Sequence, residues 1–402
     1  MSVSKYAYSY ARVRARMSGL LDERRLRELV DARGEDFLAL LMNTTYKEKL
    51  TNAGVAAGVS GGVDARRIER ALKEELVGQY LMVIKSIEGA RAARAVFEEL
   101  LRRLEVKNLK AVLRAKAAAE VVGTGTGEET GTGTGEGTGT GTGEGTGTGT
   151  GAEEGVEGAM FFPVEDFFGR RISRLFEADS VESVVKELEE PYRRVLEAAL
   201  PAAVLQGEAK GEGSGRRVLA LENALDAEIS GSVWEKTGRL NAKEKGIVRR
   251  IVGTEFDIVN LMILLRCKSE GVEEREMRRY FLPYWYAFDF GADAMRDSVS
   301  AESVSASVQA MPAGSAGSAY KEVLSGALAA YEAEKTLFPF ENALWKHFFA
   351  TVKNTLRGYP INIGTAIGFL YLKEAEVRNL CTIAVCKENE LPAEETMKIL
   401  LT

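Results

Sequence analysis

The clearest pattern of apolar and polar positions lies in "EFDIVNLMILLRCKSEG", from Glu255 to Gly271. Its apolar spacing is that of a helix, yet Asn260 stands in the middle, although asparagine disfavours helix interiors because its side chain competes for backbone hydrogen bonds. At about 100° per residue, Asn260 shares one face with Asp257 and Lys268. The pattern predicts a helix whose polar face is either a site or a packing device.

The rest of the chain has a similar character. Runs rich in Ala, Leu, Glu, Arg and Lys, with only 8 prolines in 402 residues, predict an all-α fold. Apolar residues make up 45% and charged residues 28%, which is ordinary for a soluble globular protein of two or three domains. The net charge of −6 does not favour nucleic-acid binding, and no apolar run is long enough to span a membrane. Three cysteines without a CxxC motif, and an N-terminus without an apolar signal region, suit a reducing cytoplasm.

The helix predicted from Glu255 to Gly271 is one of three related segments in the chain. "EVKNLKAVLRAK", "DIVNLMILLRCK" and "EVRNLCTIAVCK" align without a gap, and they begin at Glu105, Asp257 and Glu376. A glutamate motif, "ERAL" or "ENAL", recurs upstream at Glu69, Glu222 and Glu341. A tyrosine motif recurs further upstream at Tyr46, Tyr192 and Tyr320. The chain is therefore interpreted as three copies of one helical unit, joined head to tail.

The boundaries of the copies follow from these spacings. We assign 1–122 to the first helical unit, 123–159 to an insert and linker, 160–275 to the second unit and 276–402 to the third. Within the insert, Gly123 to Gly151 consists of 14 Gly, 11 Thr and 4 Glu, which predicts a disordered, solvated tether. This segment holds no Lys or Arg, which argues against a phosphate-binding glycine loop.

Polar residues that recur in all three copies are better explained by architecture than by catalysis, because an active site needs one convergent geometry. We interpret the repeated asparagines, together with the glutamate and tyrosine motifs, as a fold signature. The asparagines are expected to hydrogen-bond a loop or a neighbouring helix end, and they are Asn108, Asn260 and Asn379. The repeated lysines are expected to cap carbonyls near helix C-termini or to reach a partner, and they are Lys116, Lys268 and Lys387.

No catalytic, cofactor-binding or metal-binding residue is predicted. His347 is the sole histidine, and it is either a helix-surface or partly buried residue beside Trp345 and Phe348 or a general base. Cys267 and Cys386 occupy the same repeat position, which predicts a slot for a small residue rather than a metal ligand.

Two further stretches stand out. "YAYSYARVRARM", from Tyr6 to Met17, alternates aromatic and basic residues that a helix spreads over several faces. It either docks to a partner or closes the first unit against the third. The small residues of "YPINIGTAIGFLYLKE", from Tyr359, predict close backbone packing.

The repeated helices resemble the C subunit of archaeal A-type ATP synthases, the equivalent of the d subunit of eukaryotic V-type ATPases. The likeness extends to "YSYARVRARMSGLL" near the start and to "PINIGTAIGFLYLKEAEVRNL" near the end, and it covers nearly the whole chain apart from the insert and a loop near Gly207. One departure is "VCKENE" at Val385, where the third copy lacks the arginine of the family pattern and the glycine that follows it.

The resemblance implies three pseudo-threefold-related helical units that form a funnel, in a non-catalytic subunit of the central stalk, or rotor. It also implies a peripheral position at the cytoplasmic face of the cell membrane. The implied partners are the central-shaft subunits and the membrane ring that carries protons or sodium ions. The resemblance implies no nucleic-acid partner, no cofactor and no nucleotide site in this subunit. The candidate partner contacts are cations at matching helix ends, namely Arg114, Lys116, Arg266, Lys268 and Lys387.

Three alternatives from other classes stay open at this point. A generic helical-repeat scaffold of another complex has the same architecture, although its repeats are commonly shorter. An enzyme acting through His347 or a pair of carboxylates would lose turnover on His347→Ala. A protein that binds the membrane surface through its N-terminal arginines would bind anionic vesicles in a salt-sensitive way.

Overall fold

The computed structural model describes residues 2–55, 62–87, 89–124, 161–169, 172–208, 213–288, 295–314 and 317–401. Within these ranges all regular structure is helical and no strand occurs, so the predicted all-α class is confirmed. The Gly/Thr-rich insert lies outside the described residues, apart from its first two positions at the end of a helix.

The chain divides into two compact units. Unit 1 comprises Met1–Leu104, Phe162–Val164 and Asp226–Thr402, and unit 2 comprises Glu105–Phe161 and Glu165–Leu225. Two long helices cross the division along the chain, α6 (Arg91–Thr124) and α11 (Gly213–Gly238). The prediction of three helical copies rests on repeats in the sequence. A division by compactness does not test it, so it stays a prediction.

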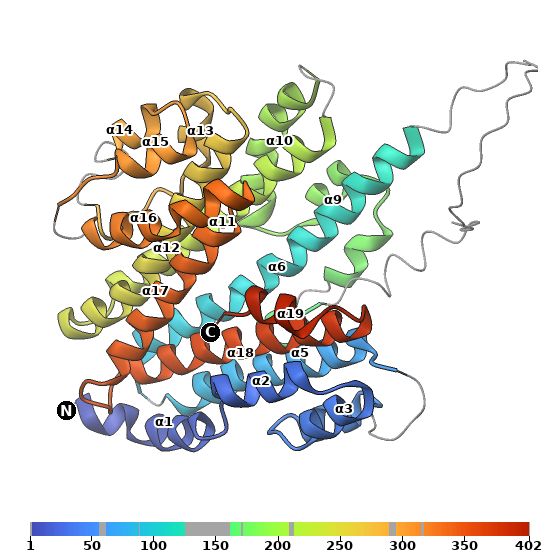
Figure 1. Cartoon of the computed structure of the whole chain (residues 1–402), viewed down its shortest axis with the longest axis vertical. Helices are drawn as coiled ribbons and strands as arrows, with labels where there is room; N and C mark the ends of the chain where they lie inside the picture. The colour runs from blue at the N-terminus through green and yellow to red at the C-terminus, as the bar shows by residue number, and fades with distance from the viewer. Residues whose placement is uncertain are drawn as a thin grey trace, which may run out of the picture. The chain divides into compact units, whose positions relative to one another are not determined.

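Unit 1 holds the first five helices and the last eight (Figure 1). The N-terminal helices are α1 (Ser2–Met17), α2 (Glu23–Asp31), α3 (Gly34–Met42), α4 (Lys47–Asn52) and α5 (Ala65–Ser86). The later helices are α12 (Ala242–Ser269), α13 (Glu274–Tyr280), α14 (Arg296–Ser300), α15 (Val304–Gln309), α16 (Ser318–Glu334), α17 (Phe338–Leu356), α18 (Ile363–Glu388) and α19 (Ala393–Ile399).

Side-chain caps set the starts of the long helices in unit 1. Asp64 accepts a hydrogen bond from the backbone N–H of Arg67 at the start of α5, and Asn241 does the same from Glu244 at the start of α12. Asn362 caps α18 through the N–H of Gly364. Such caps satisfy N–H groups that have no partner within the helix.

The core of unit 1 forms where α18 packs along α5, and Figure 1 shows the two helices side by side. On α5, Ile68, Leu72 and Leu76 are buried at four-residue spacing, which gives the helix one apolar stripe. The first elements of the chain pack against its last ones, because α1 contacts α18 and α2 contacts both α18 and α19. Both ends of the chain therefore belong to one core.

The small residues near the start of α18 serve close packing, as their sequence predicts. A Cβ atom added at Gly364 would lie 2.6 Å from Ile247 Cγ2, and one at Gly368 would lie 2.8 Å from Leu356 Cδ2. Real Cβ atoms do not approach other atoms so closely. Glycine is thus the residue that lets α18 approach α12 and α17.

Unit 2 contains the C-terminal part of α6, the N-terminal part of α11 and four shorter elements. These are α8 (Glu165–Phe168), the 3₁₀ helix η1 (Ile172–Glu177), α9 (Val181–Glu187) and α10 (Tyr192–Glu208). Ser180 caps α9 by accepting a hydrogen bond from Ser183 N. The elements α9, α10 and η1 pack together around buried valines and leucines such as Val184 and Leu196.

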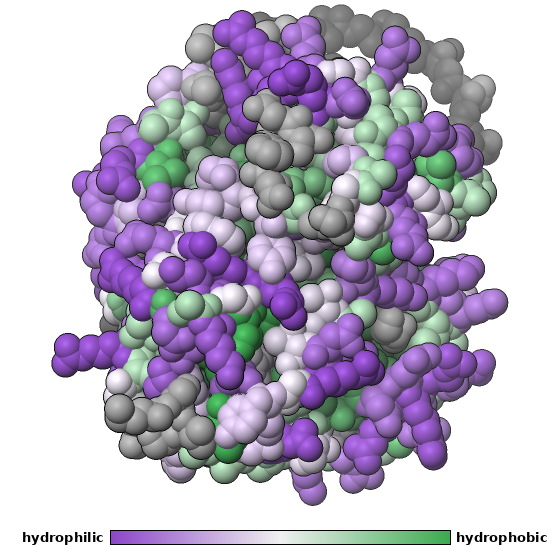
Figure 2. Space-filling view, turned by 90° about the vertical axis from the view of Figure 1, so that its left-hand side faces the viewer, coloured by the Kyte–Doolittle hydropathy of each residue, from purple (hydrophilic) through white to green (hydrophobic). Residues whose placement is uncertain are grey.

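One face of the molecule is mainly polar at its surface. On the face drawn in Figure 2, hydrophilic side chains predominate and hydrophobic ones show between them in small areas. Scattered exposed apolar residues are normal for a folded protein and mark no site by themselves.

Candidate functional site

The carboxylates that begin the three repeated segments are buried, and each accepts a hydrogen bond from a repeated tyrosine. The three O–H···O bonds are Tyr192–Glu105 at 2.9 Å, Tyr320–Asp257 at 3.1 Å and Tyr46–Glu376 at 2.6 Å. The tyrosine of the second copy binds the carboxylate of the first, and that of the third copy binds the second. Because the tyrosine of the first copy binds the carboxylate of the third, the pairing runs cyclically through the copies. We call these bonds the tyrosine–carboxylate joints.

Two of the carboxylates also bind backbone N–H groups. Asp257 accepts hydrogen bonds from the N–H of Tyr286 at 2.8 Å and of Ala287 at 2.9 Å. Glu376 accepts one from the N–H of Leu21 and forms an ion pair with Lys373 at 2.8 Å. Burial raises the pKa of Asp257 to about 6, although its three hydrogen-bond donors act in the opposite direction. Each joint therefore fixes a segment that lies far from the carboxylate in sequence.

Asn260 and Asn379 bind the segments that follow the next short helix. Asn260 accepts from the N–H of Leu282 at 2.7 Å and donates to the carbonyls of Leu282 and Tyr284 at 3.2 and 3.1 Å. Asn379 accepts from the N–H of Leu401 at 2.9 Å and donates to its carbonyl at 3.0 Å. The two partners lie 22 positions after their asparagines. This is the loop-binding role that the sequence predicts, and the third asparagine, Asn108, is also buried.

Two of the repeated lysines bind backbone carbonyls of other helices. Lys116 donates to the carbonyl of Phe176 in η1, and Lys387 donates to that of Val30 in α2. Both acceptors lie in the last turn of their helix, where a cation is favourable. Each lysine thus caps the C-terminal end of another helix and not of the helix on which it lies. For Lys268, no such bond occurs among the described residues, and burial lowers its pKa.

The arginines of the repeats pair with the glutamate motifs. Arg114 donates to Glu222 at 2.8 Å, and Arg266 lies 3.5 Å from Glu341. Both arginine side chains stay mostly exposed, at 64% and 58%. In the third copy the arginine position is Val385, and the remaining motif glutamate, Glu69, pairs with Lys73 of its own helix at 2.7 Å. That these cations contact a partner stays a prediction.

The structure also shows a largely buried charge cluster that the sequence patterns did not predict. Arg103 forms an ion pair with Glu255 and donates to the hydroxyl of Tyr371 at 2.7 Å, and this hydroxyl donates to Glu255 at 2.6 Å. Tyr80 donates to Glu374 beside them. Burial acts to lower the pKa of Arg103, but Glu255 and Tyr371 outweigh it, so this pKa lies well above its ordinary value. We call these five residues the central cluster.

A sequence signal for the central cluster exists in hindsight. Arg103, Glu255 and Glu374 each stand two positions before the repeated carboxylate of their copy. Equivalent positions of three copies therefore meet in one place within unit 1. The residue types differ between the copies, which is why the alignment of identical residues did not reveal them.

His347 lies on α17, where it is half-buried with its ring 5.3 Å from that of Tyr320. Burial lowers its pKa, so the imidazole is neutral near pH 7. Among the described residues, no group of three His, Cys, Asp or Glu side chains is placed to hold a metal ion. Cys267 and Cys386 are both buried.

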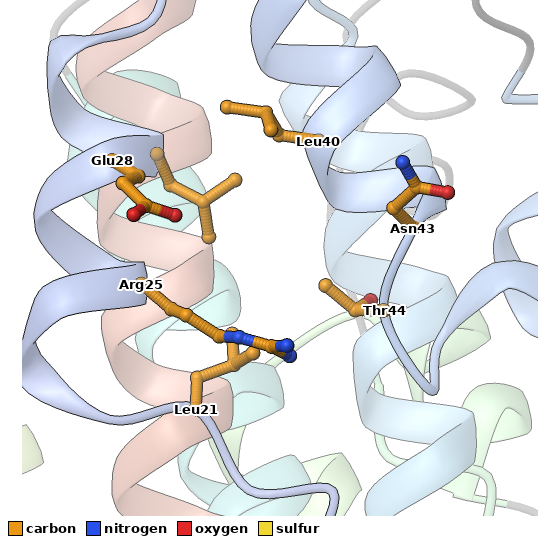
Figure 3. Close-up of a pocket in the computed structure, with 7 residues that line it drawn as sticks. Leu21, Arg25, Glu28, Leu40, Asn43 and Thr44 are labelled. Carbon is orange, nitrogen blue, oxygen red and sulfur yellow. The ribbon is translucent and has the colours of Figure 1, made fainter.

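One pocket lies between α2 and α3 (Figure 3). Its volume is about 150 Å³, well below the roughly 300 Å³ or more that is typical of small-molecule sites. It is lined by Leu21, Arg25, Glu28, Leu29, Leu40, Asn43 and Thr44. In Figure 3, Arg25 extends across the opening from α2 towards Thr44. The pocket is too small for a nucleotide.

Comparison with known proteins identifies the family. The family model described as ATP synthase (C/AC39) subunit matches residues 9–129 and 148–399. The chain belongs to the ATP synthase (C/AC39) subunit family. Members of this family are structural rather than catalytic subunits, so the chain is a non-catalytic subunit of a rotary ATP synthase. None of the described helices is long and apolar enough to cross a bilayer.

Relatives of the C/AC39 family match over nearly the full length of the chain. The C subunit of the A-type ATP synthase from Methanocaldococcus jannaschii is 27% identical, over 100% of this chain and 88% of the relative. The protein of the same name from Methanothermobacter thermautotrophicus is 29% identical, over 98% and 87%. That from Pyrococcus abyssi is 23% identical, over 97% and 88%.

Proposed function

We propose that the chain is the central-stalk subunit that couples the membrane ring of an A-type ATP synthase to the central shaft. In this role it is peripheral, at the cytoplasmic face of the membrane, and turns with a ring that carries protons or sodium ions. The observation that carries the proposal is the match, over nearly the whole chain, to relatives that are named as the C subunit of the A-type enzyme.

The internal contacts support a role in transmitting torque. A coupling subunit must keep its shape under load, and the buried joints tie distant segments of the chain by charge-assisted hydrogen bonds. The meeting of equivalent positions in the central cluster supports a pseudo-threefold arrangement of the copies. We include that arrangement, and the funnel that the family resemblance implies, in the proposal.

The partner contacts in this proposal are the repeated cations. Arg114 and Arg266 are the better candidates, because their side chains are largely exposed even while each pairs with a glutamate of its own chain. Lys116 and Lys387 are weaker candidates, because each already donates to a carbonyl of its own chain. As a candidate for partner contact, Lys268 ranks between the two arginines and the two lysines.

The test is a mild detergent extraction of the native membrane with an affinity tag on this chain, followed by mass spectrometry. We expect a nucleotide-hydrolysing hexamer, shaft subunits and a small, very hydrophobic ring protein to copurify. The double variant Arg114→Gln/Arg266→Gln should weaken retention of a partner at moderate salt. A matched control is Arg24→Gln/Arg239→Gln, which removes two exposed arginines that pair with glutamates four positions away in the chain.

Purification of the chain alone, or with unrelated soluble proteins, would contradict the coupling role and favour a scaffold of another complex. If both double variants retained the partner subunits equally, the coupling role would stand, but the repeated arginines would not be part of the contact.

A further inference from the structure

Helix α1 differs from the other surface helices in its charge. Its 16 residues include one lysine and three arginines but no acidic residue. Lys5 pairs with Glu244 at 2.7 Å. Among the described residues, no ion pair is formed by Arg12, Arg14 or Arg16, in a chain whose net charge is −6.

Several exposed arginines elsewhere pair with a glutamate four positions away in the chain. Arg24 pairs with Glu28, Arg94 with Glu98 and Arg239 with Glu235, each at 3.0 Å or less and four positions apart. Such pairs leave the surface locally neutral. The arginines of α1 instead create a positive surface.

The two faces of α1 have different roles. Tyr6, Ser9 and Val13 are buried, and the helix packs against α18 and α5. The residues that face outward are Ala7, Tyr8, Ala11, Arg12, Arg14, Ala15 and Arg16. Tyr8 is 54% exposed, and the guanidinium of Arg12 lies over its ring, 5.6 Å from the centroid. The cations therefore do not close one part of the fold against another, and they remain available to a partner.

We infer that the outward face of α1 binds the anionic headgroups of a phospholipid bilayer. The three guanidinium groups match phosphate oxygens, which they bind in bidentate geometry. The exposed ring of Tyr8 suits the headgroup level, where aromatic residues with a polar tip are enriched. Between them stand alanines, so the face lies on the surface without inserting a large apolar side chain.

A bilayer fits this face better than an acidic protein does. A protein partner would need carboxylates in register with three arginines, whereas an anionic bilayer offers phosphates at every position. The inference rests on the proposed function for the presence of a membrane beside the chain.

The experiment is cosedimentation of the purified full chain with lipid vesicles in the absence of other subunits. The probes are vesicles of phosphatidylcholine alone and of phosphatidylcholine mixed with phosphatidylglycerol, at low and high salt. We compare the wild type with Arg12→Gln/Arg14→Gln/Arg16→Gln. The control variant Arg24→Gln/Arg27→Gln/Arg94→Gln has the same net charge but loses paired arginines only. Circular dichroism verifies that the variants are folded.

We expect binding to the anionic vesicles alone, weakening as salt rises. Each basic side chain near an anionic surface is worth about fivefold in affinity, so the α1 variant should bind on the order of a hundredfold more weakly. The control variant should bind nearly as the wild type does.

Absence of binding by the wild type, or equal loss in both variants, would overturn the inference without bearing on the coupling role. If the α1 variant bound vesicles normally but no longer copurified with the other subunits, α1 would contact an acidic protein, and the lipid assignment would be wrong.

Discussion

Asp257 carries an unusual balance of forces for a single side chain. It is fully buried, which disfavours its charged form, yet it accepts hydrogen bonds from Tyr286, Ala287 and Tyr320, which favour that form. Burial is the larger effect and raises its pKa to about 6. The tyrosine–carboxylate joint at this position is therefore sensitive to pH.

The first prediction concerns the stability that Asp257 contributes at different pH. Because the native state binds the proton more tightly than the unfolded chain, the contribution is fully present below about pH 4 and is lost as pH rises through about 6. A shift of this size corresponds to about 3 kcal/mol. We expect the free energy of unfolding of the wild type, relative to Asp257→Asn, to fall by about that amount between pH 4 and pH 7.

Urea denaturation at a series of pH values measures this difference. The exposed substitution Asp297→Asn serves as the control, and its difference from the wild type should stay nearly constant. A constant difference for Asp257→Asn as well would mean that the three donors offset the burial of the carboxylate.

At this scale the sequence allowed the polar residues to be predicted but not their partners. The asparagines and lysines were recognisable because they recur at one register. Their partners are backbone groups, such as the carbonyl that Lys116 binds 60 positions away and the one that Lys387 binds 357 positions away. A backbone carbonyl has no residue type, so no pattern in the sequence marks it.

At the scale of the elements, the central cluster joins four helices. Tyr80 lies on α5, Arg103 on α6 and Glu255 on α12, while Tyr371 and Glu374 lie on α18. A buried ion pair does not stabilise a fold more than apolar packing of the same volume, but removal of one partner leaves an uncompensated charge. The cluster therefore fixes how these helices meet.

The second prediction is that Arg103→Met destabilises the protein strongly. The substitution leaves the carboxylate of Glu255 buried without its cation, and the expected loss is about 3–5 kcal/mol. Arg24→Met removes an exposed ion pair and should cost no more than about 1 kcal/mol. Both values follow from urea denaturation at pH 7. A loss below about 1 kcal/mol for Arg103→Met would mean that water reaches the cluster in solution.

The helices themselves were predictable as a class, since composition and apolar spacing both favour helix. How they meet was not. Arg103, Glu255 and Glu374 occupy one register of the repeat, but only folding brings them together, and their different charges hid the correspondence. The charges at these equivalent positions are opposite because the residues contact one another. A search for identical residues in the copies does not find such positions.

At the scale of the whole molecule, the two ends of the chain bind each other. The middle copy makes the corresponding contacts with residues that follow it directly in the sequence. The joint at Asp257 is made with residues that follow it by 29 to 63 positions. The joint at Glu376 is made with Leu21 and Tyr46 near the other end of the chain. The last repeated helix, α18, is therefore completed by the N-terminal helices. The repeats in the sequence define the copies but do not tell which copy supplies the partner.

The third prediction follows from this closure, and hydrogen exchange followed by mass spectrometry tests it. Tyr46→Phe removes a donor to the buried carboxylate of Glu376, and a hydrogen bond to a charged group contributes about 1.5–3 kcal/mol. We expect amide exchange to accelerate roughly tenfold or more in both 2–55 and α18–α19, because they are held together and open as one cooperative unit.

Tyr192→Phe is the matched comparison, since it removes the donor to Glu105 within unit 2. In that variant the faster exchange should fall in α9 and α10, while α18 keeps its protection. If Tyr46→Phe accelerated exchange only around α4, the N-terminal helices would be held to α18 by apolar packing alone. The cyclic order of the joints would then describe the geometry of the fold but not the forces that close it.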